Sequence, residues 1–380
     1  MKILFLTASA GEGHNSICRT LDGYIKLNYS NVETKIVDIF KSSSKLRHGI
    51  LNHYYHICNL FPRLSNQTFQ HTRAVDYTNK HNPLVGFFVQ HAVKVIKQLI
   101  IEEKPDVIYC AHTFAAIAVA KIRKKQPYLV PESIKVFSVV SDFDVAPFTE
   151  CLRLVDYIFV PNQDLVDDVK AKNFNEEQIL LASIPIAETF YEDSDKTLLR
   201  QKLDLEDKFT VLMMSGAKSF TNTYSIIKDI IKNKREEDDF QVVVINGKNK
   251  KLYTQIEKLI EKTGADYIKN YGFVDKIEPY MEAADVIFSK LGGITTTEAL
   301  AKGLPIIAPA RLPLQENNNR DFLVEKNVCV ALKKDKDLME TIRYIKQEHN
   351  HKKMLESIKN LKQTNDLRKI CDKMVNAKAM

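Results

Sequence analysis

Short apolar runs rich in valine, isoleucine and phenylalanine recur along this chain, and they constrain its fold more than any other feature. They lack the alternation of apolar and polar residues that is typical of a strand with one solvent-exposed face. Each run therefore predicts a strand that is buried on both faces, as in a parallel sheet. Helix-like stretches such as 84–103 and 114–125 separate the runs. This alternation predicts an α/β protein with doubly wound sheets.

The runs fall into two sets. The first comprises 2–8, 33–40, 106–112, 134–142 and 157–162; the second comprises 209–215, 240–246, 266–272, 285–290, 305–310 and 328–332. Residues 181–195 lie between the sets, and Pro185 with the acidic residues after it is typical of a domain boundary. A chain of 380 residues suits two domains. The final stretch, 335–378, predicts charged amphipathic helices.

Charge and cysteine usage narrow the class of protein. The formal net charge of +7 favours anionic ligands or an anionic surface without requiring nucleic acid. Six cysteines are scattered with no CxxC pair, which predicts reduced, buried thiols. No run approaches the ~18 apolar residues that a membrane span needs. A peripheral position on a membrane remains compatible with these features.

The stretch 289–323 carries the strongest sign of a ligand site. A glycine pair, Gly292 and Gly293, follows a strand, and a helix is expected to open near Thr295. Glycines let a phosphate approach the backbone, and a helix N-terminus offers unpaired N–H groups. Glu298 would either cap its own helix or accept hydrogen bonds from ribose hydroxyls. Taken alone, a solvated loop with a helix cap explains the stretch equally well.

A second glycine-containing turn, TASAGEGHNS, follows the first strand at residues 7–16. Gly11 and Gly13 are expected to let the chain turn tightly, so that His14 stands at the top of the strand. A histidine suits the task of taking a proton from a hydroxyl near neutral pH. The plainer reading is a histidine that caps or packs at the start of a helix.

Residues 40–73 are basic and aromatic and contain no acid. Such a segment suits an anionic membrane surface. The residues expected to contact lipid are Lys45, Arg47, Tyr54, Tyr55, Phe61 and Arg63. The alternatives are a surface helix packed on the first domain and, with no motif in its favour, nucleic-acid binding.

Several motifs, in order along the chain, resemble one family. GGITTTEALAKGLPII with PLQENNNRDFL resembles the donor-site signature of the glycosyltransferases that include MurG, monogalactosyldiacylglycerol synthase and processive diacylglycerol glucosyltransferases. INGKNKKL, YGFVDKIEPYMEAADVIFSKLGG, ASIPI and the GEGH turn resemble further elements of that family. The GxGH form and the K-GG-T-TEA form are most similar to the diacylglycerol branch.

The resemblance implies a GT-B fold, in which two Rossmann-like domains face each other across a cleft. Residues 1–185 would form the acceptor-binding, membrane-facing domain, and 186–200 the linker. Residues 201–355 would bind the UDP-sugar donor, and 356–380 would form a helix that crosses back to the first domain.

The family's functional residues carry over to matching positions. For the donor, the backbone of Phe273 and Val274 would hold the nucleobase, and Glu298 would bind the ribose. The diphosphate would be bound by Gly292, Gly293, Ile294 and Thr295, and the sugar or its phosphates by Gln315, Glu316 and Asn319. The pocket would be shaped by Gly216, Gly247 and Asn249. His14 would be the catalytic base, and Asp142 would orient a histidine or bind the acceptor.

The implied activity is an inverting transfer of a hexose from UDP-glucose or UDP-galactose to diacylglycerol or a glycosyl-diacylglycerol. The expected partners are the UDP-sugar, the lipid and an anionic membrane surface, with no nucleic acid, no cofactor and no tightly bound metal. The expected location is the cytoplasmic face of the cell membrane, with peripheral attachment. The resemblance does not distinguish glucose from galactose.

Two segments depart from the family's pattern and keep alternatives open. SGAKSF (215–220) has less glycine than is usual there, and SDFDVAPFT (141–149) keeps Asp142 but lacks a nearby histidine and tryptophan. The alternatives are a MurG-like transferase that uses UDP-N-acetylglucosamine with a polyprenyl-linked or soluble acceptor, a UDP-sugar epimerase, and a catalytically silent UDP-sugar-binding regulator.

Overall fold

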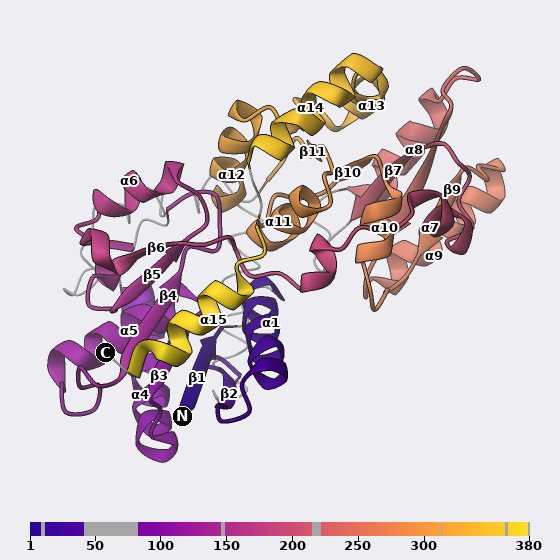
Figure 1. Cartoon of the computed structure of the whole chain (residues 1–380). Coiled ribbons are helices and arrows are strands. Elements are labelled where there is room, and N and C mark those ends of the chain that lie inside the picture. The colour runs from indigo at the N-terminus through magenta and orange to yellow at the C-terminus, as the bar shows by residue number, and fades with distance from the viewer. Residues whose placement is uncertain are drawn as a thin grey trace. The chain divides into compact units, whose positions relative to one another are not determined.

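The computed structural model describes residues 1–8, 12–41, 83–145, 149–214, 222–312, 314–361 and 364–378. The chain divides into two compact units, and each is built on its own sheet (Figure 1). The first unit is Met1–Ala187 with Thr364–Met380, and the second is Glu188–Gln363. The last helix in the sequence thus belongs to the first unit.

The first unit contains a six-stranded parallel sheet in the order β2-β1-β3-β4-β5-β6. Its strands are β1 (Lys2–Thr7), β2 (Glu33–Asp38), β3 (Val107–Cys110), β4 (Lys135–Val139), β5 (Tyr157–Val160) and β6 (Ile179–Leu181). The run from Ile3 to Leu6 is fully buried. Burial on both faces of the sheet is what its unbroken apolar sequence predicts.

Helices cover both faces of this sheet. They are α1 (Glu12–Asn28), α4 (Pro83–Glu103), α5 (Thr113–Lys125), α6 (Asp164–Lys170) and α15 (Leu367–Val375). On one face, Leu4 and Val136 share a buried cluster with Ile96 of α4 and Ile117 of α5. The aromatic rings of the central strands contact one another on the other face. Helices α1 and α15 contact each other over this face (Figure 1).

The C-terminal helix is tied to its unit by polar contacts as well. The Tyr29 hydroxyl donates to the Asp372 carboxylate of α15 at 2.7 Å, and the Ser183 N–H donates to Asp366 at 2.8 Å. The buried stripe of α15 contains Ile370, Cys371 and Met374. This helix is therefore part of the core of the first unit.

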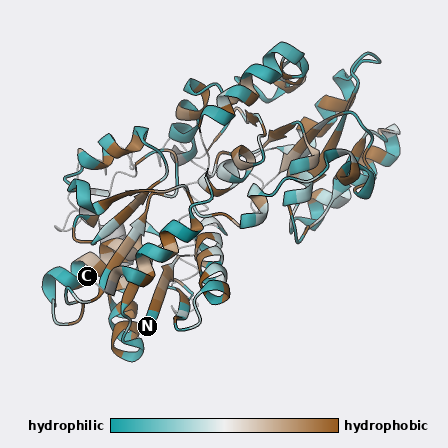
Figure 2. Cartoon of the chain, viewed as in Figure 1, coloured by the Kyte–Doolittle hydropathy of each residue, from teal (hydrophilic) through white to brown (hydrophobic). Residues whose placement is uncertain are grey.

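The second unit repeats the architecture with the order β12-β11-β10-β7-β8-β9, again parallel. Its strands are β7 (Phe209–Met214), β8 (Phe240–Ile245), β9 (Ile268–Tyr271), β10 (Val286–Phe288), β11 (Ile306–Ala308) and β12 (Cys329–Ala331). Its helices are α7 (Lys196–Lys202), α8 (Thr223–Asn233), α9 (Lys250–Thr263), α10 (Glu278–Ala283), α11 (Gly293–Ala301), α12 (Leu314–Glu325), α13 (Leu338–Lys346) and α14 (Glu348–Asn360). Apolar strands are flanked by helices with polar outer faces in both units (Figure 2).

The α/β class and the doubly wound sheets are confirmed, and every strand expected from an apolar run is present. The sequence analysis missed β6, which has three residues and ends at Leu181, the first residue of the expected boundary segment. The expected linker, 186–200, contains a 3-10 turn, Glu188–Tyr191, and the beginning of helix α7. In α7, Lys196 and Arg200 both bind the Asp285 carboxylate at the start of β10, which fixes this helix to the second unit.

The cysteine expectation is confirmed at the four positions whose side chains the structure describes. Cys18, Cys110, Cys329 and Cys371 are buried free thiols. Burial raises the pKa of the Cys18 thiol to about 12, so this group stays protonated at physiological pH.

Candidate functional site

Three strand ends of the first unit bring polar residues to one edge of the sheet. His14 follows β1, His112 follows β3 and Asp142 follows β4. These strands are parallel neighbours, so their carboxyl ends lie side by side. In an open α/β sheet, this is the edge where ligands bind.

His14 lies in the first turn of α1, and its ring orientation is fixed by the backbone. Its Nδ1 is 2.7 Å from the carbonyl oxygen of Ala111, the residue just beyond β3. A carbonyl can only accept, so Nδ1 carries the hydrogen and Nε2 keeps a free lone pair. Burial lowers the pKa of His14, and its bond to Ala111 opposes that effect. The ring is thus neutral near pH 7, with the acceptor nitrogen that a general base requires.

A buried hydrogen bond ties the end of β1 to the turn that carries His14. The Thr7 hydroxyl donates to the Asn15 side-chain oxygen at 2.8 Å, and both residues are buried. The sequence reading missed this pair. Gly13, expected in a tight turn before the helix, lies in the first turn of α1 itself, and the other glycine of the motif, Gly11, is outside the described residues.

His112 is a second histidine at this edge, which the sequence reading also missed. It is the N-cap residue of α5, and its Nδ1 accepts the Phe114 N–H at 3.1 Å. Its ring lies edge-on to that of His14, with 4.5 Å between centroids and 66° between planes. Burial and, second, the proximity of His14 hold the pKa of His112 well below its usual value. The motif CAHT at the end of an apolar run was the available signal.

Asp142 lies in the bend after β4 and is half-buried. The nitrogen that an orienting carboxylate would hold, Nδ1 of His14, is instead occupied by the Ala111 carbonyl. Asp142 therefore does not orient His14 through this nitrogen, and its expected roles, orienting a histidine or binding the acceptor, stay predictions.

In the second unit, two loops at the carboxyl edge of the sheet meet beside Phe273. Gly247 follows β8 with φ +56°, in the left-handed region that favours glycine, and its N–H donates to the Gly272 carbonyl at 3.1 Å. Asn249 caps α9 by accepting the Leu252 N–H at 3.1 Å. The Phe273 ring is 61% exposed, and the Lys248 ammonium lies 5.5 Å from its centroid. Val274 comes next and is half-buried.

The glycine pair lies where β10 leads into α11, as the sequence predicts. Gly292 is the N-cap residue, and Gly293, Ile294 and Thr295 form the first turn of α11. The first N–H groups of a helix have no acceptor within it and carry its positive dipole end. A Cβ on Gly292 would lie 3.2 Å from the Lys290 ammonium, so a side chain there would crowd this cation. The turn can therefore receive an anion such as a diphosphate.

Glu316 and Asn319 of α12 hold this turn from beneath. Glu316 accepts from the Lys290 ammonium at 2.7 Å and from the Leu291 N–H at 3.1 Å. The Asn319 side-chain amide donates to the Leu291 carbonyl at 2.7 Å. The two residues are 7% and 0% exposed. The structure thus places both against the turn, and the sequence reading missed this supporting position.

Glu298 is the remaining donor-site candidate on α11. Its carboxyl group has no hydrogen-bond partner among the residues that the structure describes. Burial, with a smaller contribution from Glu278, raises its pKa to about 8. A carboxyl group held without a partner is suited to receive hydrogen bonds from a ligand's hydroxyl groups.

Several expected site residues lie outside the described residues. They are Lys45, Arg47, Tyr54, Tyr55, Phe61, Arg63 and Gly216, together with the side chain of Gln315. The expectation of a membrane-binding segment at 40–73 therefore stays a prediction.

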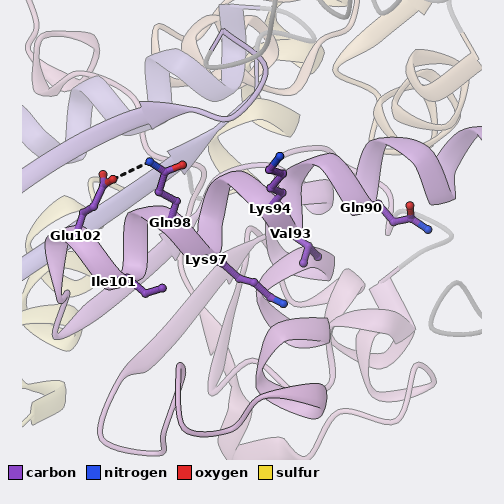
Figure 3. A pocket seen from close by; sticks show the side chains of 7 residues that line it. All are labelled: Gln90, Val93, Lys94, Lys97, Gln98, Ile101 and Glu102. Atoms are coloured by element: carbon purple, nitrogen blue, oxygen red, sulfur yellow. Dashed lines mark hydrogen bonds between the residues drawn. The ribbon is translucent and has the colours of Figure 1, made fainter.

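A shallow hollow of about 460 Å³ lies along α4 in the first unit (Figure 3). It is lined by Gln90, Val93, Lys94, Lys97, Gln98, Ile101 and Glu102. These residues lie on the half of α4 that leads to the amino end of β3. His14 and His112 instead follow the carboxyl ends of β1 and β3, at the opposite edge of the sheet. The hollow is separate from the histidine site.

Within the described ranges, no helix is both long and apolar enough to cross a bilayer. The same ranges contain no group of three or more histidine, cysteine or acidic side chains arranged to hold a metal ion.

Two known families match this chain, one over most of the first unit and one over most of the second. Residues 14–186 match the family "Monogalactosyldiacylglycerol (MGDG) synthase", and residues 210–373 match the "Glycosyltransferase family 28 C-terminal domain". A processive diacylglycerol beta-glucosyltransferase of Bacillus mycoides is 28% identical over 349 residues, which cover 91% of this chain and 86% of the relative.

Solved structures support the fold. MurG of Acinetobacter baumannii has a TM-score of 0.65 at 11% identity, with 99% of each chain covered. A UDP-GlcNAc 2-epimerase of Neisseria meningitidis has a TM-score of 0.59 at 14% identity, with 99% of this chain and 100% of that chain covered. Transferases and epimerases thus share this architecture, so the fold alone does not separate them.

The two sheets, the glycine turn before α11 and the matched families define a glycosyltransferase of the GT-B class. The chain belongs to the glycosyltransferases that join a monogalactosyldiacylglycerol synthase domain to a family 28 C-terminal domain. The family resemblance seen in the sequence motifs is confirmed.

Proposed function

We propose that this protein transfers a hexose from UDP-glucose or UDP-galactose, with inversion, to the hydroxyl of diacylglycerol or a glycosyl-diacylglycerol. The observation that carries the proposal is the state of His14. Its Nδ1 donates to Ala111, which leaves Nε2 as a free acceptor at the carboxyl edge of the first sheet. An inverting transfer needs such a base for the attacking hydroxyl.

The second unit would bind the donor. The diphosphate would lie at the first turn of α11, near the Lys290 ammonium. The ribose hydroxyls would donate to Glu298, whose carboxyl has no partner among the described residues. The nucleobase would lie beside Phe273 and Val274 and pair with their backbone. These roles agree with the family 28 match over residues 210–373.

The first unit would bind the acceptor, and the chemistry follows from His14. Nε2 takes the proton of the acceptor hydroxyl as its oxygen attacks the anomeric carbon. The bond from that carbon to the phosphate oxygen breaks on the opposite face, and its electron pair leaves with UDP. One displacement inverts the anomeric centre. The α11 N-terminus and Lys290 stabilise the charge that develops on the leaving diphosphate.

A lipid acceptor is supported by the family match of the first unit and by the activity named for the Bacillus relative. The basic, aromatic segment 40–73 would hold the protein on an anionic membrane surface, at the cytoplasmic face. The structural similarities to the epimerase and to MurG, at 14% and 11% identity, support only the fold.

A donor and acceptor panel tests the proposal. The purified chain is supplied with UDP-glucose, UDP-galactose or UDP-N-acetylglucosamine, and with diacylglycerol in anionic micelles or a polyprenyl phosphate. We expect a labelled glycolipid from a UDP-hexose and diacylglycerol, with the β configuration by NMR. Product only with a polyprenyl acceptor, or binding of every donor without product, would overturn the proposal.

A further inference from the structure

The histidine pair at the carboxyl edge of the first sheet presents two different ring nitrogens. His14 is held by Ala111 so that its Nε2 is an acceptor. His112 uses Nδ1 to accept the Phe114 N–H, so a neutral His112 must carry its hydrogen on Nε2. The rings are in contact, with 4.5 Å between centroids. The pair therefore offers one acceptor and one donor side by side.

Neither Nε2 has a hydrogen-bond partner among the described residues, and both side chains are half-buried. Burial holds the pKa of His112 well below its usual value, and the neighbouring His14 lowers it further. The ring thus stays neutral and keeps its donor hydrogen on Nε2 at physiological pH. A half-buried donor without a partner is suited to a ligand atom.

We propose that His112 is a second acceptor-binding residue, which donates its Nε2–H to an oxygen on the carbon next to the one that bears the attacking hydroxyl. In a diacylglycerol this oxygen belongs to the central ester, and in a sugar acceptor it is the neighbouring hydroxyl. His14 takes the proton from the attacking hydroxyl, while His112 fixes the direction of that hydroxyl. The role of His112 rests on the proposed function, because it requires an acceptor with two adjacent oxygens.

The capping contact of His112 allows two matched variants. In His112→Asn, the side-chain oxygen can still cap α5 near the former Nδ1 position, but the Nε2 donor is lost. In His112→Gln, the side-chain amide can place an N–H near the former Nε2 position, but the cap is lost. The first variant should retain wild-type stability, and the second should lose some of it.

Two acceptors complete the test: a short-chain diacylglycerol, and an analogue in which an alkyl chain of equal length replaces the central ester. A neutral hydrogen bond corresponds to about a tenfold effect. We expect the wild-type protein to favour the diacylglycerol by about tenfold in kcat/KM. His112→Asn should lose this preference through the acceptor KM, with an unchanged KM for the UDP-sugar, and His112→Gln should keep part of it.

A preference that is the same in His112→Asn and in the wild-type protein would overturn the role of His112 and leave the proposed function standing. A wild-type protein that does not distinguish the two acceptors would also overturn it. A wild-type protein that makes no glycolipid from either acceptor would overturn the proposed function, and the role of His112 with it.

Discussion

The Glu316 carboxylate lies 2.7 Å from the Lys290 ammonium, and its second oxygen accepts the Leu291 N–H at 3.1 Å. One buried side chain of α12 therefore fixes both the cation and the backbone at the turn before α11. The Lys290 side chain remains about one-third exposed, whereas that of Glu316 is 10% exposed. The cation is held at the glycine turn and can still approach an anion from solvent.

Replacing this carboxylate should weaken donor binding. Glutamine has one acceptor oxygen where glutamate has two. In Glu316→Gln, the new NH2 group must therefore face a donor, either the Lys290 ammonium or the Leu291 N–H. We expect the free energy of unfolding to fall by about 1–3 kcal/mol and the KM for the UDP-sugar to rise several-fold, with an unchanged acceptor KM. The matched control is Glu348→Gln, which breaks the exposed pair with Lys352 and should change neither KM. An unchanged donor KM in Glu316→Gln would contradict this role.

Glu298 predicts a pH dependence of stability. Its pKa is raised from 4.5 to about 8, so between these values the folded protein holds a proton that the unfolded chain releases. Stability contributed by this group is present below pH 4.5 and is lost as the pH rises through 8. We expect the difference in unfolding free energy between wild type and Glu298→Gln to change by about 2–4 kcal/mol from about pH 5 to about pH 9. Urea denaturation without nucleotide measures it, and a constant difference would refute the prediction.

His14 predicts the acid limb of the activity profile. Because burial lowers its pKa below the usual 6.5, kcat/KM should be level above that pH and fall to half at a lower pH. His14→Ala should lower kcat by about 10²–10⁴-fold. The control is His349→Ala, at an exposed position of α14. A half-maximal pH above about 7, or a His14→Ala variant with nearly full activity, would speak against His14 as the base.

Gly247 should be sensitive to a side chain even though there is open space around it. Its φ of +56° lies in the left-handed region, and nothing lies within 4 Å of the position that a Cβ would take. Gly247→Ala should destabilise the protein by about 1–2 kcal/mol through backbone strain alone. Gly272→Ala is the matched control, since it also meets open space and its backbone is outside that region. Equal stability of the two variants in urea would contradict the strain argument.

Most of the fold followed from the apolar runs. Each expected strand is present, and the central strands follow from unbroken runs of Val, Ile and Phe, which can be buried on both faces of a parallel sheet only with helices between the strands. The edge strands β2 and β9 are more polar and only partly buried, so for them the expected burial on both faces was wrong. The strand β6 was not predicted because Ile179–Leu181 is only three residues long, which is too short an apolar run to indicate a strand next to Pro185. Helix α7, which begins within the expected linker, was also not predicted. Its Lys196 and Arg200 are held by Asp285, a residue so far along the chain that local sequence does not reveal the contact.

The candidate site was predicted less completely, for a physical reason. His14 and the glycine turn are local motifs, whereas the place of His112 depends on β3 lying beside β1, which is a property of strand order. Glu316 and Asn319 belong to a polar run that is typical of an exposed segment. Their burial arises only when α12 packs beneath the turn that contains Leu291.

The most direct test of the account is the transfer of labelled glucose or galactose from its UDP-sugar to diacylglycerol in phosphatidylglycerol micelles, by wild type and His14→Ala in parallel. We expect a labelled glycolipid from the wild-type protein, and UDP-sugar binding with almost no product from the variant. Glycolipid formed at equal rates by both proteins, or by neither, would contradict it.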